Sequence, residues 1–89
     1  MEQVFKHYVG VIAYINMTGQ LKPLYIVWNE GVKYKIDLVY RVFPAASQAG
    51  GGGILYECKV AHKRIKLYQE KNRWFIETSQ APFDYWSES

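Results

Sequence analysis

The sequence predicts an all-β domain built from six short antiparallel strands. Apolar and polar residues alternate with a period of two along most of the chain, and turn-favouring residues recur every 8–15 positions. No stretch longer than a turn repeats its apolar residues every 3.6 positions, so we expect almost no helix. The 89 residues include three Trp, eight Tyr and four Phe, which fits one small domain with a thin core of large side chains.

The first two strands are expected at residues 4–15 and 21–28, with a turn at residues 16–20 between them. Gly10 inside the first strand indicates a bulge or a bend, because glycine weakens a regular strand. Pro23 cannot donate a backbone hydrogen bond, so the second strand should begin near it or lie at a sheet edge.

The third strand, residues 32–43, follows a tight turn at residues 29–31 in which Gly31 can adopt a positive φ angle. Its apolar and charged residues alternate clearly, as in a strand with one buried and one wet face. The expected inner face comprises Tyr34, Ile36, Leu38, Tyr40 and Val42, and the expected outer face comprises Lys33, Lys35, Asp37 and Arg41.

The last three strands are expected at residues 54–60, 64–69 and 74–78, after a loop that ends in four glycines. Six strands connected in sequence form a meander, and curling the meander covers its apolar face and removes free edges. We therefore expect it to close into an SH3-like barrel or half-open roll at residues 1–79, followed by an aromatic tail at residues 80–89. In the fourth strand, the residues expected to point inward are Ile54, Tyr56, Cys58 and Val60.

Cysteine content and hydropathy indicate the compartment. Cys58 is the only cysteine, so the chain forms no internal disulfide and no cysteine-cluster metal site, and a reducing cytoplasm is expected. The first residues do not resemble a signal peptide, and no apolar run approaches the ~20 residues that span a bilayer. We expect a cytoplasmic protein that binds neither a membrane nor a metal.

The sequence shows no constellation of catalytic residues. His7 and His62 have no second His, Asp or Cys at metal-ligand spacing, and the carboxylates are too scattered for a general acid–base pair. The glycine run precedes a strand and lacks the Lys-Ser/Thr of a phosphate-binding loop, which indicates a flexible connection. In the alternative interpretation, the backbone N–H groups of this run bind an anion together with Arg41. We expect a protein that is not an enzyme and has no cofactor.

Positive charge gathers in the middle of the chain. Residues 33–66 hold seven cations and two acids, a net +5, whereas the remaining residues sum to −2. Alternation of cations with tyrosines predicts a surface for single-stranded nucleic acid, through phosphate contacts and base stacking. In the alternative interpretation the tyrosines face the core and the lysines are solvated. The candidate nucleic-acid-binding residues are Arg41, Lys59, Lys63, Arg64, Lys66 and Tyr68.

The tail is a second candidate binding segment. Phe83, Tyr85 and Trp86 lie within seven residues of its start, and exposed rings favour association. We expect the tail either to cover an open end of the barrel or to dock on a partner protein or a second copy of the chain.

The chain resembles a group of short uncharacterised bacterial proteins over most of residues 8–77. The most specific shared elements are Trp-x-x-Gly-x-x-Tyr, beginning at Trp28, and Trp-Phe, beginning at Trp74. A more distant resemblance, to a family of unassigned function often encoded beside Y-family translesion DNA polymerases, implies an association with DNA repair. His62 stands where the group has a turn glycine, so a longer turn is expected before Arg64. The other shared stretches are residues 9–13, 23–28, 31–37, 41–47, 51–56 and Leu67.

These patterns predict a non-catalytic binding or accessory module, with nucleic acid as the leading ligand. The alternative is a protein-interaction module or homodimer that uses exposed aromatic side chains and a free strand edge. The two differ in their response to salt, because phosphate binding releases counterions and weakens steeply as salt rises.

Overall fold

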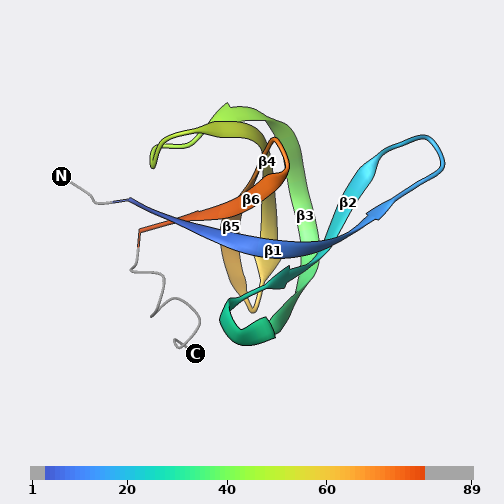
Figure 1. Ribbon diagram of the computed structural model, residues 1–89, viewed down its shortest axis with the longest axis horizontal. Coiled ribbons are helices and arrows are strands. Elements are labelled where there is room, and N and C mark those ends of the chain that lie inside the picture. The colour runs from blue at the N-terminus through green and yellow to red at the C-terminus, as the bar shows by residue number, and fades with distance from the viewer. Residues whose placement is uncertain (1–3, 80–89) are drawn as a thin grey trace.

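The computed structural model describes residues 4–79 and shows an all-β chain whose six antiparallel strands close into a small barrel (Figure 1). Each strand pairs with the next along the chain, and β1 pairs with β6 to close the ring. The predicted meander and its closure are confirmed, whereas the aromatic tail and the roles expected for it lie outside the described residues. The elements are β1 (Phe5–Ile15), β2 (Leu21–Val27), a 3-10 turn η1 (Asn29–Gly31), β3 (Lys33–Ala46), β4 (Gly52–Val60), β5 (Lys63–Glu70) and β6 (Arg73–Thr78).

Two tight turns use left-handed backbone conformations. Gly31 has a φ of 79°, as the sequence predicts, and Glu30 before it has a φ of 64°. The prediction of a longer turn at His62 is wrong. Val60 pairs with Lys63, so only two residues lie between the strands. Ala61 and His62 have φ angles of 51° and 66°, the geometry of a two-residue turn that matches the twist of its flanking strands.

Two bulges in β3 change which of its side chains face the core. The register with β4 slips once between Ile36 and Leu38 and again between Val39 and Arg41. Each slip inserts one extra residue, so the expected alternation fails between Ile36 and Arg41, and the second slip restores it, because Val42 pairs with the inward-facing Tyr56. Val39 packs against the inner core, whereas Leu38 is 51% exposed, which corrects the sequence prediction.

β1 and β3 are long because each pairs with two neighbours in turn. β1 pairs with β6 up to Val9 and with β2 from Gly10 onward, so Gly10 marks the change of partner. The register with β2 slips between Ile12 and Ala13 rather than at Gly10. Figure 1 shows the β1–β2 hairpin projecting from the barrel as an arm, defined here as residues 12–25.

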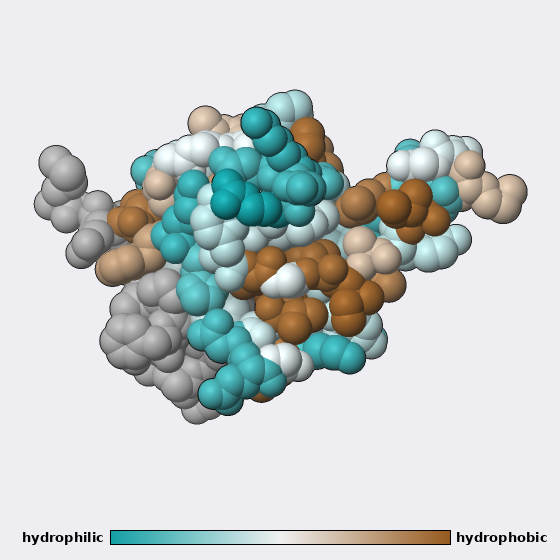
Figure 2. All heavy atoms as spheres, in the orientation of Figure 1, coloured by the Kyte–Doolittle hydropathy of each residue, from teal (hydrophilic) through white to brown (hydrophobic). Residues whose placement is uncertain are grey.

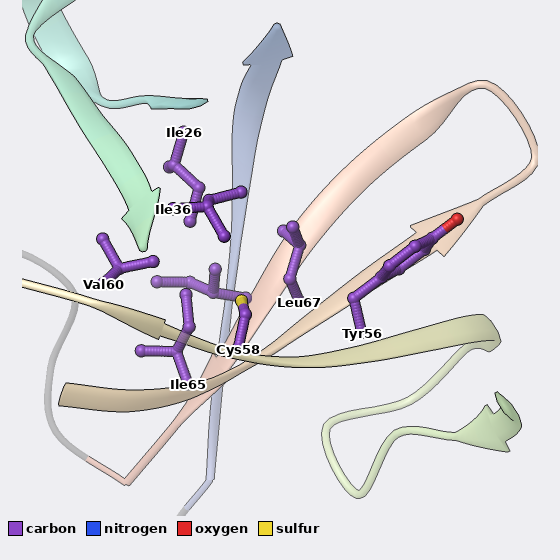
Figure 3. Close-up of a cluster of buried hydrophobic side chains, with 8 residues drawn as sticks. Ile26, Ile36, Tyr56, Cys58, Val60, Ile65 and Leu67 are labelled. Carbon is purple, nitrogen blue, oxygen red and sulfur yellow. The ribbon is translucent and has the colours of Figure 1, made fainter. Parts of the chain in front are cut away.

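The barrel interior holds the main hydrophobic cluster. In the close-up of Figure 3 the labelled aliphatic side chains and Cys58 gather together from β2, β3, β4 and β5, whereas the Tyr56 ring extends away from them. The inward face predicted for β4 is confirmed, since Tyr56, Cys58 and Val60 belong to this cluster and Ile54 packs against it. The cluster comprises Ile26, Ile36, Tyr56, Cys58, Val60, Ile65, Leu67 and Ile76.

A second, smaller cluster lies on the outer side of the same strands. It comprises Leu55, Tyr68 and Phe75, with Phe43 packed against it, so β4, β5 and β6 bury side chains on both faces. Figure 1 shows the β3–β4 hairpin curling at its end. A side chain at Gly53 would overlap the carbonyl oxygen of Gln69, so glycine allows this close approach of two backbones.

Candidate functional site

Five strands carry a row of alternating charges on the outer surface of the barrel, here named the charge ladder. Arg41 Nε lies 2.8 Å from Glu57 Oε1, and Lys66 Nζ lies 3.7 Å from Glu77 Oε1. The hydrogen bond from Arg41 lowers the pKa of the Glu57 carboxyl below its ordinary value. Two of the cations expected to contact phosphate are therefore paired with carboxylates. The strand registers order the ladder as Arg41, Glu57, Lys66, Glu77 and Lys6.

The other predicted cations do not form a single group. Lys59 and Arg64 are direct neighbours in the β4–β5 register, and the guanidinium carbon of Arg64 lies 4.2 Å from the centroid of the Tyr40 ring. Lys63 pairs with the buried Val60, so strand alternation places it on the opposite face from Arg64. Four of the predicted cations thus share the outer face and Lys63 does not.

Tyr68 is not available for base stacking at the surface, contrary to the role predicted for it. Its side chain is 2% exposed and its ring stacks on Phe75 with centroids 4.9 Å apart. Burial raises the pKa of Tyr68 to about 12, and the Glu77 carboxylate beside it adds to the effect. Tyr40, which is 37% exposed, instead lies under Arg64, and the Phe43 ring lies 4.7 Å from the guanidinium carbon of Arg41.

The glycine-containing loop between β3 and β4 binds carboxylates of the chain itself. The backbone N–H of Gln48 donates to Glu77 Oε2 over 2.8 Å, and that of Gly52 donates to Glu70 Oε2 over 3.4 Å. The Ser47 hydroxyl also donates to Glu77 Oε2, over 2.7 Å. The anion site considered for these amides is therefore used to fasten the loop to β5 and β6.

The arm carries apolar side chains that are exposed to solvent. Ile12, Tyr14, Ile15 and Met17 are 39%, 57%, 63% and 101% exposed. Figure 2 shows hydrophobic side chains gathered on the arm and again beside β1 in the middle of the same face. Such a group on the surface of a small domain is typical of an interaction site.

Hydrogen bonds fix the conformation of the arm's tip. Asn16 Oδ1 accepts bonds from the backbone N–H groups of Thr18 and Gln20, over 3.0 and 2.8 Å. The backbone N–H of Asn16 donates to the Gln20 carbonyl over 3.0 Å, which closes the turn. The exposed side chains are thus presented on an ordered support, which lowers the entropic cost of binding.

A cleft separates the arm from the second half of β3. β2 pairs with β3 from Tyr25↔Lys35 to Val27↔Lys33, and within residues 4–79 no further pair joins these two strands. One hollow of about 430 Å³ is lined by residues 22–25 of β2 and residues 35–39 of β3. A second hollow, of about 480 Å³, lies between the arm and the cross-strand pair Val42 of β3 and Tyr56 of β4. Lys22 borders both hollows, so they adjoin.

The residues considered for catalysis occupy structural positions. Cys58 is buried, and burial raises the pKa of its thiol to about 12. The His7 ring stacks on Trp28 with centroids 4.3 Å apart. Within the described part of the chain, no three His, Cys, Asp or Glu side chains are grouped as metal ligands would be. Among the same residues no helix is long and apolar enough to cross a bilayer.

Comparisons of the chain with protein-family models, curated proteins and solved structures find no match.

Proposed function

We propose that the chain is a protein-binding module whose contact surface is the arm together with the adjoining cleft. The observation that supports this most directly is the distribution of exposed apolar side chains. Within residues 4–79, seven of the ten large hydrophobic residues that are exposed lie on the arm or border the cleft. Leaving them in water is unfavourable, and covering them with a partner recovers that free energy.

The charged face supports the nucleic-acid alternative less well. Arg41 and Lys66 are held by carboxylates of neighbouring strands, so a phosphate must compete with Glu57 and Glu77 for them. The arm has no such internal competitor for Met17, whose side chain is fully exposed. We therefore rank protein binding ahead of nucleic-acid binding.

The proposal is tested by using the wild-type chain and two variants, each with three substitutions, as baits for partner proteins. The arm variant combines Tyr14→Thr, Ile15→Thr and Met17→Ser, which removes apolar surface while threonine keeps strand propensity. The control variant combines Lys59→Gln, Arg64→Gln and Lys66→Gln, which lie on the charged outer face of the barrel and not on the arm. Proteins captured from a lysate by the wild-type chain are identified by mass spectrometry and then purified for affinity measurement.

The expected result is a partner whose affinity falls at least tenfold in the arm variant and less than twofold in the control variant. The partner's affinity should change little between 50 and 300 mM salt, since apolar contact releases few counterions. Equal affinity of the wild-type and arm variants for every partner would overturn the proposal. Circular dichroism verifies that both variants fold.

Nucleic-acid binding remains a second candidate because of one specific contact. The register sets Lys59 beside Arg64, so two cations meet on the outer face, where the Glu57 carboxylate also interacts with Arg64. With Tyr40 under the Arg64 guanidinium, these residues offer a phosphate contact and a ring on one surface. The resemblance to a family encoded beside translesion polymerases adds to this proposal.

Fluorescence anisotropy with labelled single-stranded DNA and RNA tests it. Micromolar binding that weakens steeply with salt and is lost in the combined variant Lys59→Ala, Arg64→Ala, Lys66→Ala would support it. Absence of binding at 50 mM salt would refute it.

A further inference from the structure

The cleft is bordered by strand edges that the barrel does not pair. Beyond Lys35, β3 continues for eleven residues to Ala46 with β4 on one side, and in the described structure β2 does not follow it. On the facing side, residues 21–23 of β2 pair with β1. Unpaired backbone N–H and C=O groups along such an edge are a template for another strand.

Apolar side chains line the cleft on both sides of that edge. Val42, 52% exposed, borders the hollow that Tyr14 and Leu21 of the arm also line. Leu38, 51% exposed, borders the hollow next to Pro23 and Leu24. A strand laid between them would therefore bury apolar side chains on alternate positions, since successive side chains of a strand point to opposite faces.

The charged residues around the cleft determine which residues a bound partner strand can carry. Lys22 and Lys35 lie on its two sides, and Asp37 is the one acid among the residues that line the first hollow. The net charge there is positive, so a carboxylate in the bound segment is favoured and a lysine is not. The two bulges of β3 twist its edge, which restricts the registers that a partner can adopt.

We infer that the partner of this module supplies an extended segment that adds as a strand to the free edge of β3, with apolar residues at alternate positions and an acidic residue beside Lys22 and Lys35. This inference rests on the proposed function and names the class of partner for the same surface. The occupant is a segment of another protein, because a peptide strand satisfies the backbone edge, the apolar lining and the charge together.

The probe is a phage-displayed library of random twelve-residue peptides, selected against the wild-type chain. The tightest peptide is synthesised, and its dissociation constant is measured by fluorescence anisotropy. Each of its backbone amides is then N-methylated in turn, which removes one hydrogen-bond donor and leaves every side chain unchanged. We expect methylation at every second residue to weaken binding by about tenfold or more, and methylation between them to change it less than about threefold.

A matched pair of substitutions places the peptide on the protein. Val42→Asp sets a charge in the cleft and should weaken binding at least tenfold. Val32→Asp makes the same change at a site that is 46% exposed and outside the cleft, and it should have little effect. Both positions are exposed, so both variants should fold.

Three results would overturn the inference. They are a selection without any binder, a methylation profile without the period of two, and equal binding by the two valine variants. A wild-type dimer that Val42→Asp dissociates would assign the cleft to a second copy, and single-stranded DNA that competes for the cleft would assign it to nucleic acid. If the arm variant loses its protein partner while the methylation profile is flat, the proposed function stands and the strand-addition inference fails.

Discussion

Replacing Phe75 with alanine tests whether the outer cluster is a true second core. Phe75 is fully buried, stacks on Tyr68 at 4.9 Å and meets the Tyr8 ring at 5.6 Å, while Lys6 Nζ lies 4.5 Å from its centroid. A phenylalanine in such surroundings costs about 3–5 kcal/mol when truncated to alanine. A domain of this length has a total stability of about 4–13 kcal/mol, so the variant should lose a large share of it.

The loss should lower the Tm by about 15–30 °C, measured by circular dichroism, and reduce the urea midpoint accordingly. Tyr8→Phe is the control, because it removes the 3.0 Å hydrogen bond to Glu70 at an exposed site and keeps the ring. The control should change stability by less than about 1 kcal/mol. If Phe75→Ala costs no more than Tyr8→Phe, the outer cluster is not packed and the strands have one buried face.

Three further predictions concern single residues. Gly53→Ala should destabilise the fold by about 1–3 kcal/mol in urea titration, because the new methyl group overlaps the Gln69 carbonyl oxygen, and unchanged stability would contradict this close approach. The pKa of Glu57 is lowered in the folded state, mainly by the hydrogen bond from Arg41, so its contribution is present above the unfolded pKa near 4.5 and is lost as the pH falls below it. The urea midpoints of the wild type and Glu57→Gln should therefore differ more at pH 7 than at pH 3, and a difference independent of pH would exclude this role. Cys58, buried with a pKa raised to about 12, should react with a disulfide reagent at pH 8 no faster than the chain unfolds, and rapid labelling of the native protein would show that the thiol is accessible.

Local sequence pattern predicted the strands and turns because each depends on nearby residues. Alternation located all six strands, and the glycine at position 31 located a turn that requires a positive φ. The inward face of β4 was also predictable, since Tyr56, Cys58 and Val60 alternate without interruption.

The faces of β3 and the outer cluster depend on pairing between distant strands, so the pattern failed there. The bulges after Ile36 follow from the register with β4, which one strand's sequence does not contain. The charge ladder has the same origin, because Arg41 meets Glu57 across strands. A signal for the outer cluster was present in the adjacent apolar pairs, such as Leu67-Tyr68 and Phe75-Ile76, which indicate strands buried on both faces.

The pairing of β1 with β6 has a consequence for synthesis of the chain. Of the six strands, β1 is synthesised first, and its residues 5–9 pair with β6, the last of the six. At about 5–20 residues per second, some 4–14 seconds pass before residues 74–78 can close the ring. During that interval residues 5–9 of β1 lack their partner strand, so β1 is the strand that waits longest for a neighbour and is open longest to pairing with other chains. A chaperone that shields the first strand should therefore raise the yield of folded protein more than one that acts after release.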